Sequence, residues 1–341
     1  MLHPCKYKNL DSFFLPLRPL DYKTMLIQFL ILAAGLLLIL FGANYLVDGA
    51  SSIAKKFGLS EFIIGVTIVG IGTSAPEMVV SILSAIQGKA DMAIGNVVGS
   101  NIFNTLMILG VTALIAPLTI TRNNIRKDIP INIIVTVLLL LLGMHFTLFG
   151  IGDDCLSRID GVLMLGIFVW YLWSSFRGDS ADEDESEMKI YPIWLAAIMI
   201  LGGLAGLVFG GRLFVNSATE IAKALGVSDK FIAITIMAAG TSMPELATCV
   251  VAAFKGRGQL ALGNILGSNI SNILLILGLS SLITPLSFKG ITFVDMGILL
   301  FCSVFILLSA YIFKSKKLDR VEAIILLLAE FGNMWYLIAN I

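Results

Sequence analysis

Charged residues are scarce in this chain of 341 residues, where they make up 13%, against roughly 25% in a typical soluble domain. Hydrophobic residues make up 57%. A water-soluble globular protein is therefore excluded. Lysine plus arginine and aspartate plus glutamate number 23 each, so no basic excess is present for binding the phosphates of a nucleic acid, and we expect no nucleic-acid partner.

Histidine and cysteine are scarce as well. The two histidines, His3 and His145, and the four cysteines lie far apart, and no two cysteines have the spacing of a zinc or haem motif. This excludes a disulfide scaffold, a zinc cluster and attached haem, and we expect no cofactor. An intramembrane enzyme would need an aspartate pair, a serine with a histidine, or a metal triad inside the membrane, so we expect no enzyme.

Long hydrophobic runs dominate the sequence. A transmembrane helix needs about 20 apolar residues, and the chain supplies ten such runs separated by short polar breaks. We therefore predict an all-α integral membrane protein with ten transmembrane helices. The predicted spans are residues 25–47, 60–86, 91–116, 129–149, 159–176, 191–214, 228–254, 260–284, 291–313 and 320–340.

Two polar segments fall outside these spans. Residues 1–24 are predicted to be an extramembrane N-terminal tail, and residues 178–190, with the acidic run 179–187, a solvated linker between the halves 25–177 and 191–341. Loops after odd-numbered spans hold 13 lysines and arginines, against 6 in the other loops. Because positive charges collect on the cytoplasmic side, we expect both termini to face away from the cytoplasm.

An internal repeat relates the two halves. Residues 70–118 (the first copy) align with residues 238–286 (the second copy) at a constant offset of 168, with 23 identities in 49 positions and no gap. The copies contain GTSAPE with GNVVGSNIFN and GTSMPE with GNILGSNISN. Five predicted spans separate equivalent points, so the second copy is inverted in the membrane. Two inverted five-helix repeats are typical of secondary transporters, whose site lies at the repeat interface.

Each copy carries one carboxylate deep in an apolar span, Glu77 and Glu245, where a charge is costly and usually functional. Hydroxyl and amide side chains share a helical face with it or with each other at a spacing of four residues. These pairs are Thr73 with Glu77, Thr241 with Glu245, Ser100 with Asn104, and Ser268 with Asn272.

Prolines in both motifs add backbone oxygens to this set. Pro76 and Pro244 lack an amide hydrogen and kink the helix, so we expect the carbonyl groups of Gly70 and Ala238 to be free to bind a cation. An all-oxygen set suits hard cations such as calcium and sodium, not zinc or copper.

Four glycines and one further glutamate complete the inventory. Gly95, Gly99, Gly263 and Gly267 have the small-xxx-small spacing and are expected to let neighbouring spans approach closely. Glu330 in the last span has no counterpart in the other half, and we interpret it as hydrogen-bonded packing.

The doubled motifs resemble those of the cation/calcium antiporter superfamily, and its microbial sodium/calcium exchangers in particular, over residues 25–341. The resemblance implies a secondary active antiporter that exchanges calcium for sodium by alternating access, in which the first span of each half slides against a core of motif-bearing spans. The expected partners are calcium and sodium ions and the lipid bilayer, and we expect a functional monomer.

The resemblance also implies a role for each motif residue. Calcium would bind at Glu77, Glu245, Thr73 and Thr241; the flanking sodium ligands would be Ser74, Ser100 and the Gly70 carbonyl, with Ser242, Ser268 and the Ala238 carbonyl; Asn104 and Asn272 would fall at a middle position. Family members often have aspartate at one or both of these last positions.

Two other functions use similar residues. A proton/calcium antiporter usually carries an extra acidic residue in the GN segment, where this chain has Val97 and Ile265. A channel would use the same oxygens but would move ions only down their gradient.

Overall fold

The computed structural model describes residues 22–150, 152–177, 190–228, 232, 235–236, 238–288, 290–312 and 317–339. All but the last three residues of the predicted tail, and all but the last residue of the predicted acidic linker, lie outside these ranges. The elements, with η for π-helix, are α1 Tyr22–Phe57, α2 Glu61–Ile64, η2 Gly65–Val69, α3 Gly70–Thr73, α4 Ala75–Ile86, α5 Ala90–Phe103, η3 Asn104–Ile108, α6 Leu109–Ile115, β1 Leu118–Thr119, η4 Asn124–Asp128, α7 Ile129–Gly143, α8 His145–Phe149, β2 Cys155–Leu156, α9 Arg158–Arg177, α10 Ile193–Ala224, α12 Ala238–Thr241, α13 Met243–Phe254, α14 Gly258–Ser271, η6 Asn272–Leu277, α15 Gly278–Ile283, β3 Leu286–Ser287, α16 Phe293–Ile312, β4 Lys317–Leu318 and α17 Arg320–Ala339.

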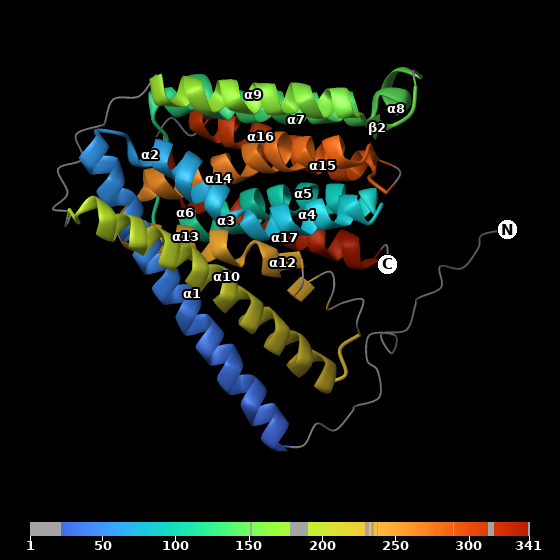
Figure 1. The fold of residues 1–341 in the computed structure, drawn as a ribbon. Helices are drawn as coiled ribbons and strands as arrows, with labels where there is room; N and C mark the ends of the chain where they lie inside the picture. The colour runs from blue at the N-terminus through green and yellow to red at the C-terminus, as the bar shows by residue number, and fades with distance from the viewer. Residues whose placement is uncertain are drawn as a thin grey trace.

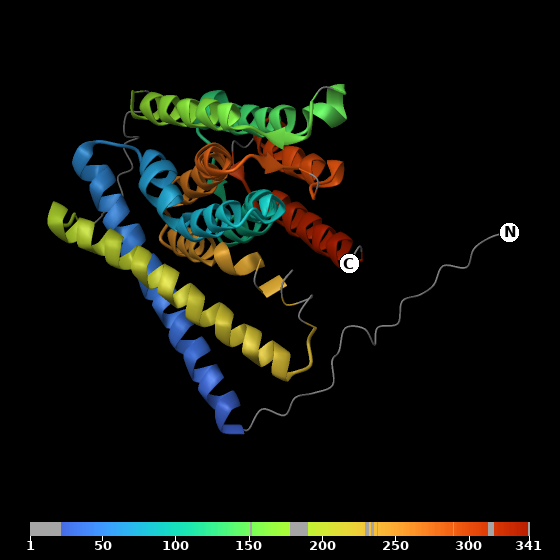
Figure 2. The same cartoon turned by 45° about the vertical axis from the view of Figure 1, so that its right-hand side comes forward.

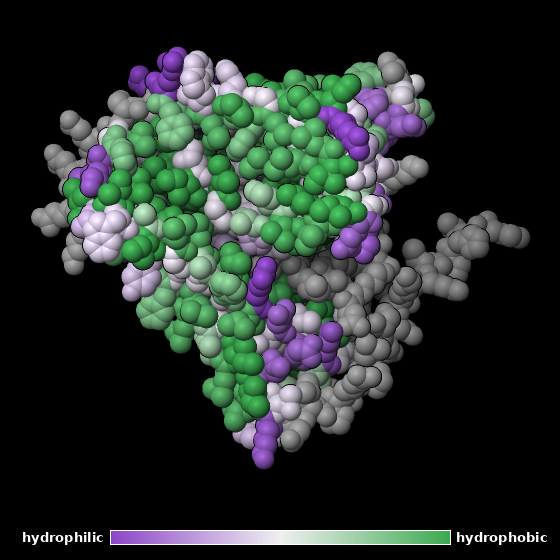
Figure 3. All heavy atoms as spheres, in the orientation of Figure 1, coloured by the Kyte–Doolittle hydropathy of each residue, from purple (hydrophilic) through white to green (hydrophobic). Residues whose placement is uncertain are grey.

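Seven helices among the described residues are long and apolar enough to cross a membrane, and an eighth crossing forms if residues 61–73 and 75–86, which bend by 48° at their break, are one span. Their outer faces are apolar: Leu328, Phe331 and Trp335 of α17 are 65%, 61% and 75% exposed. Hydrophobic residues cover most of the helical surface on the face that Figure 3 shows, and hydrophilic residues gather towards the helix ends. Such a surface is suited to lipid and not to water.

Most helices form a block of roughly aligned elements, and the long helices α1 and α10 lie side by side at its edge and run obliquely to it (Figures 1 and 2). These two helices touch through glycines. A Cβ atom added to Gly42 would lie 2.8 Å from the Gly203 carbonyl oxygen, and one added to Gly210 would lie 2.8 Å from that of Gly35. Gly203 and Gly210 are the repeat equivalents of Gly35 and Gly42, so the two contacts are reciprocal.

Inside the block, α14 lies directly against α2 and the π-helix η2. A Cβ atom on Gly263 would lie 2.4 Å from the Phe62 carbonyl oxygen, and one on Gly267 would lie 2.5 Å from the Cα of Val66. The predicted close approach is therefore confirmed at these two glycines. At Gly95 and Gly99 it stays a prediction, because residues 230 and 234, which correspond to Phe62 and Val66 in the repeat, lie outside the described part of the chain.

Some predicted helix ends are wrong. Helices α1 and α10 continue ten residues beyond the predicted ends at 47 and 214, to Phe57 and Ala224. The run predicted as one span over 129–149 breaks at Met144, with φ −122° and ψ 34°, and continues as the short α8. Asp154 accepts hydrogen bonds from the amide and the hydroxyl of Thr147, which holds α8 in its turned position. Hydropathy alone gives no sign of this contact.

Short connections are paired into two antiparallel strand pairs, β1 with β4 and β2 with β3. Residues 118–119 of β1 are the repeat equivalents of residues 286–287 of β3. Each pair thus joins one half of the chain to the other. No sequence pattern predicts strands of two residues.

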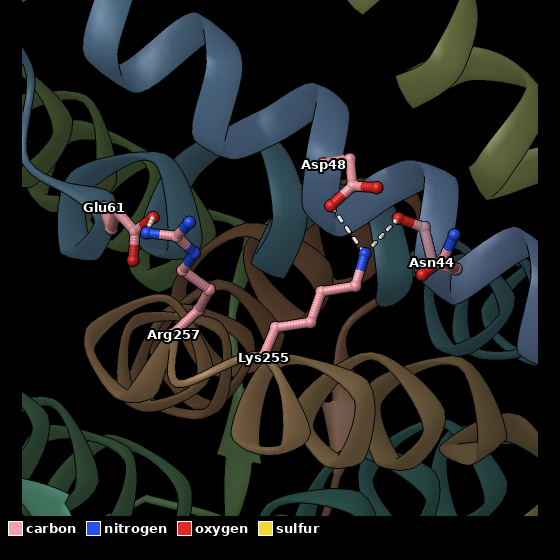
Figure 4. A network of polar contacts seen from close by, with 5 residues as sticks. All are labelled: Asn44, Asp48, Glu61, Lys255 and Arg257. Atoms are coloured by element: carbon pink, nitrogen blue, oxygen red, sulfur yellow. Dashed lines mark hydrogen bonds and ion pairs between the residues drawn. The ribbon is translucent and has the colours of Figure 1, made fainter. Parts of the chain in front are cut away.

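Two ion pairs lie where α1 and α2 meet the second half of the chain. Lys255, which follows α13, has its Nζ 2.5 Å from Asp48 Oδ1 and 3.3 Å from the Asn44 carbonyl oxygen. Beside it, Arg257 Nη1 lies 3.3 Å from Glu61 Oε1. Figure 4 shows both pairs at the junction of α1, α2 and the α13–α14 turn. They tie the first half of the chain to the second.

We expect Lys255→Met to lower the free energy of unfolding by about 1 kcal/mol, because the pair with Asp48 is only part-buried and water screens it. The loss should shrink at high salt and vanish in an Asp48→Asn background. Thermal melting in detergent measures both effects. Lys223→Met is the matched control, since Lys223 and Glu220 are 3.9 Å apart and about half exposed. An equal loss in that control would contradict the role of the Asp48 pair.

Candidate cation site

Glu77 and Glu245 each occupy the first turn of a helix that begins after a break in the backbone. Ser74, with φ −78° and ψ 9°, separates α3 from α4, and Ser242, with φ −88° and ψ 9°, separates α12 from α13. A proline follows in the first turn of each new helix, where its missing amide hydrogen costs nothing. Glu77 and Glu245 therefore sit at helix N-termini, whose dipoles favour negative charge.

The two glutamates are bonded across the copies. Ser242 Oγ donates to Glu77 Oε1 at 2.9 Å, and Ser74 Oγ donates to Glu245 Oε1 at 2.9 Å. Both carboxylates are 1% exposed. Their remaining oxygens, Oε2 in each case, are buried without a hydrogen-bond partner. A buried carboxylate oxygen is stable only when something compensates its charge.

Two asparagine side-chain oxygens are also buried without a hydrogen-bond partner. Asn104 Nδ2 donates to Asn269 Oδ1 at 3.2 Å, and Asn272 Nδ2 donates to Asn101 Oδ1 at 2.9 Å. The Oδ1 atoms of Asn104 and Asn272 are buried and have no partner. Four unpartnered oxygens, one carboxylate and one amide from each copy, are a ligand set for a hard cation.

Carboxylates alone do not form this set. Among the described residues no group of three or more His, Cys, Asp or Glu side chains could hold a metal ion. Amides, hydroxyls and carbonyls must therefore complete any cation shell around the two glutamates.

The Gly70 carbonyl is not free, contrary to expectation. It accepts from the Ser74 amide at 3.2 Å and from Ser268 Oγ at 3.2 Å, because the kink at Pro76 leaves the turn that contains Ser74 intact. Thr73 Oγ1 donates to Asn264 Oδ1 at 3.1 Å. The Ser268 contact brings together two predicted sodium ligands, one from each copy.

The other residues singled out in the sequence make fewer side-chain contacts across the described part of the chain. Ser100 is buried in α5 at 5% exposure. The side chain of Thr241 interacts with the Glu77 carboxylate. Ala238 begins α12, and its side chain lies outside the described part of the chain. Glu330 is 3% exposed in α17 and accepts from Asn333 of the same helix at 3.4 Å.

Asn101 and Asn269 were missed by sequence reasoning, which selected only the last asparagine of each motif. Both belong to the GSN triplets that the copies share. Their recurrence at equivalent positions inside apolar spans was a usable signal, since a buried amide needs partners.

The helices, their apolar outer surface and the buried oxygen cluster define an all-α, multi-pass integral membrane protein. The chain belongs to the sodium/calcium exchanger protein family, whose model matches residues 27–177 and 195–338. The family therefore covers both copies of the motif.

Known relatives match nearly the whole chain. CaxA of Alkalimonas amylolytica, named as an antiporter, is 39% identical and covers 93% of this chain and 100% of its own. The sodium/calcium exchanger MaX1 of Methanosarcina acetivorans is 33% identical, with 89% and 96% covered. A structure of the sodium-calcium exchanger NCX_Mj, soaked with zero sodium and calcium, superposes with a TM-score of 0.79 at 32% identity and covers 92% and 99%.

Proposed function

We infer that this protein is an antiporter that exchanges calcium for sodium across a membrane. The observation that carries the inference is the pair of buried carboxylates, Glu77 and Glu245, each with one unpartnered oxygen. Membership of the sodium/calcium exchanger family supports the same cations. Two carboxylates neutralise one calcium ion, and sodium has nearly the radius of calcium, so the two ions compete for the same oxygens. Mutually exclusive occupancy is what antiport requires.

We propose the ligand assignment that the family resemblance implies, in which a sodium ion at the Gly70 carbonyl would displace the Ser268 hydroxyl from it. Glu77 and Glu245 with Thr73 and Thr241 would hold calcium, and Asn104 and Asn272 would present their free oxygens at the middle position. Ser74, Ser100, Ser242, Ser268 and the carbonyls of Gly70 and Ala238 would serve the flanking sodium positions. Since Ser74 and Ser242 each donate to a glutamate across the copies, sodium binding there would require these hydroxyls to turn their lone pairs towards the ion.

The proposed architecture is ten transmembrane crossings in two inverted five-helix repeats. Reciprocal contacts support it, because residue pairs exchange places under the offset of 168. Ser74 with Glu245 and Ser242 with Glu77 form one such exchange, and the glycine contacts of α1 and α10 form another. Reciprocal pairs are the mark of a two-fold axis. The halves would be residues 25–177 and 191–341, with residues 178–190 as the linker.

Alternating access would follow from this symmetry, with α1 and α10 moving against the motif-bearing helices. We place the protein in the inner membrane of a microbe with both termini away from the cytoplasm, on the basis of the lysine and arginine distribution. The relative YrbG of Escherichia coli is named as an inner membrane protein. The proposed site uses residues of a single chain, which supports a functional monomer.

A proton/calcium antiporter is not favoured. The described GN segments carry Val97 and Ile265 where that branch would add an acidic residue, and two deep carboxylates are already required for calcium.

We expect calcium uptake into sodium-loaded vesicles that contain only this protein, driven by the outward sodium gradient. Uptake should continue after internal calcium exceeds external calcium, because the sodium gradient supplies the free energy. Radioactive calcium in the filtered vesicles measures the flux, and protein-free vesicles give the background.

Two controls separate the other functions. Replacing the sodium gradient with a pH gradient in sodium-free buffer should leave only background uptake, and equal uptake there would establish the proton antiporter. Flux that stops when calcium is equal on both sides would establish a channel.

A further inference from the structure

Four asparagines, two from each copy, form a hydrogen-bonded cluster between α5 and α14. The side-chain oxygens of Asn101 and Asn269 both have hydrogen-bond partners, whereas Oδ1 of Asn104 and Oδ1 of Asn272 have none. All four are at most 3% exposed. An amide group has nearly the same shape in both orientations, so only its hydrogen bonds decide whether its oxygen or its nitrogen faces a given side.

The orientation of Asn272 is fixed by a backbone carbonyl. Asn101 Nδ2 lies 3.0 Å from the main-chain oxygen of Asn269, and a carbonyl oxygen can only accept. The nitrogen of Asn101 must therefore face Asn269, which leaves its Oδ1 to accept from Asn272 Nδ2 at 2.9 Å. The oxygen of Asn272 is thereby turned away from Asn101, to the side where it has no partner.

The orientation of Asn104 is fixed through one hydroxyl. Thr105 Oγ1 donates to the main-chain oxygen of Asn101 at 3.0 Å, so its proton is used and it accepts from Asn269 Nδ2 at 3.0 Å. Asn269 Oδ1 then accepts from Asn104 Nδ2 at 3.2 Å, and the oxygen of Asn104 is left unpartnered. The second copy has Ile273 at the position of Thr105, so the two copies reach the same result by different routes.

We propose that Asn101 and Asn269 are positioning residues that hold the amides of Asn272 and Asn104 with their oxygens, not their N–H groups, towards the bound cation. The proposal rests on the proposed function, because it needs a cation at the unpartnered oxygens. A reversed amide would direct two partly positive hydrogens at the ion and oppose its binding. Thr105 contributes to this positioning because its hydroxyl orients the amide of Asn269.

An aspartate at the receiving position provides the test, because a carboxylate has an oxygen at both ends and needs no orientation. Asn101→Leu should lower the calcium affinity of the wild-type chain roughly tenfold, the worth of about one buried hydrogen bond. In an Asn272→Asp background the same substitution should not lower the affinity, because the Asn101 oxygen that accepted from the amide there faces a carboxylate oxygen. Calorimetric titration of calcium into the purified protein in detergent gives the four dissociation constants.

Thr105→Val repeats the test with a side chain of the same shape, in case Asn101→Leu does not fold. It should weaken calcium binding in the wild-type chain and have little effect in an Asn104→Asp background. Asn96→Leu is the matched control. Asn96 donates to the Glu77 main-chain oxygen at 3.2 Å and to Ser81 Oγ at 2.9 Å, outside the asparagine cluster, so its effect should be the same in the Asn272→Asp background.

Each outcome decides the matter. A loss that depends on the background, for Asn101→Leu or Thr105→Val and not for Asn96→Leu, supports orientation of the amides. An equal loss in both backgrounds, or no loss, overturns it and leaves these residues a packing role. Normal calcium binding in Glu77→Gln would instead overturn the cation site itself, so the two failures are distinguishable.

Discussion

Glu77→Gln and Glu245→Gln should each abolish calcium exchange while leaving a folded, membrane-inserted protein. Glutamine keeps the size of the side chain and one carbonyl oxygen but removes the negative charge. At 4 Å and an effective dielectric constant of about 20, one unit charge pair is worth about 4 kcal/mol, so a loss of at least ~10³-fold in calcium affinity is expected. Folding should survive, because a neutral amide is easier to bury in a bilayer than a carboxylate.

The two substitutions should be about equally damaging, since each glutamate is 1% exposed and bonded to one serine of the other copy. Glu330→Gln is the matched control: Glu330 is also a buried glutamate, but its recorded contact is with Asn333 of its own helix. Calcium flux per inserted molecule is the measurement, with monodispersity in detergent as the folding check. Near-normal flux in either motif variant would refute the paired-carboxylate site, and an inactive Glu330→Gln would place the pathway at α17.

Gly267→Val should destabilise the protein more than any other glycine substitution in the two motifs, apart from its neighbour Gly263. An added Cβ would lie 2.5 Å from both the Cα and the carbonyl oxygen of Val66. Backbone atoms cannot rotate aside as a side chain can, so α14 and η2 would have to separate. Overpacking in a core costs about 1–3 kcal/mol and sometimes more, and we expect the upper end here. Thermal melting in detergent measures the loss.

Gly332→Val is the control, because Gly332 is exposed in the middle of α17 and an added Cβ there meets no atom of the described chain within 4 Å. Its melting temperature should stay close to that of the unaltered protein. Equal destabilisation by both substitutions would show that the close contact of Gly267 is not what limits stability.

The repeat, both glutamates and most helices could be predicted, because each depends on local composition or on identity at a fixed offset. The asparagine cluster could not, because the partner of Asn101 lies 171 residues away at Asn272. The ion pair of Lys255 with Asp48 joins residues 207 apart in the sequence, which hydropathy does not reveal. The contact of Gly267 with the backbone of Val66 likewise joins the two halves of the chain.

The π-helical segments η3 and η6 begin at Asn104 and Asn272. A π turn contains more residues than an α turn, so the helix on the far side of each asparagine is out of phase with the helix before it. Ser100 and Asn104 share a face because both precede this change. In an alignment of related chains, a one-residue gap just after either asparagine would therefore leave the proposed cation ligands in place and convert the π turn to an α turn. The same gap before the asparagine would rotate it away from its serine.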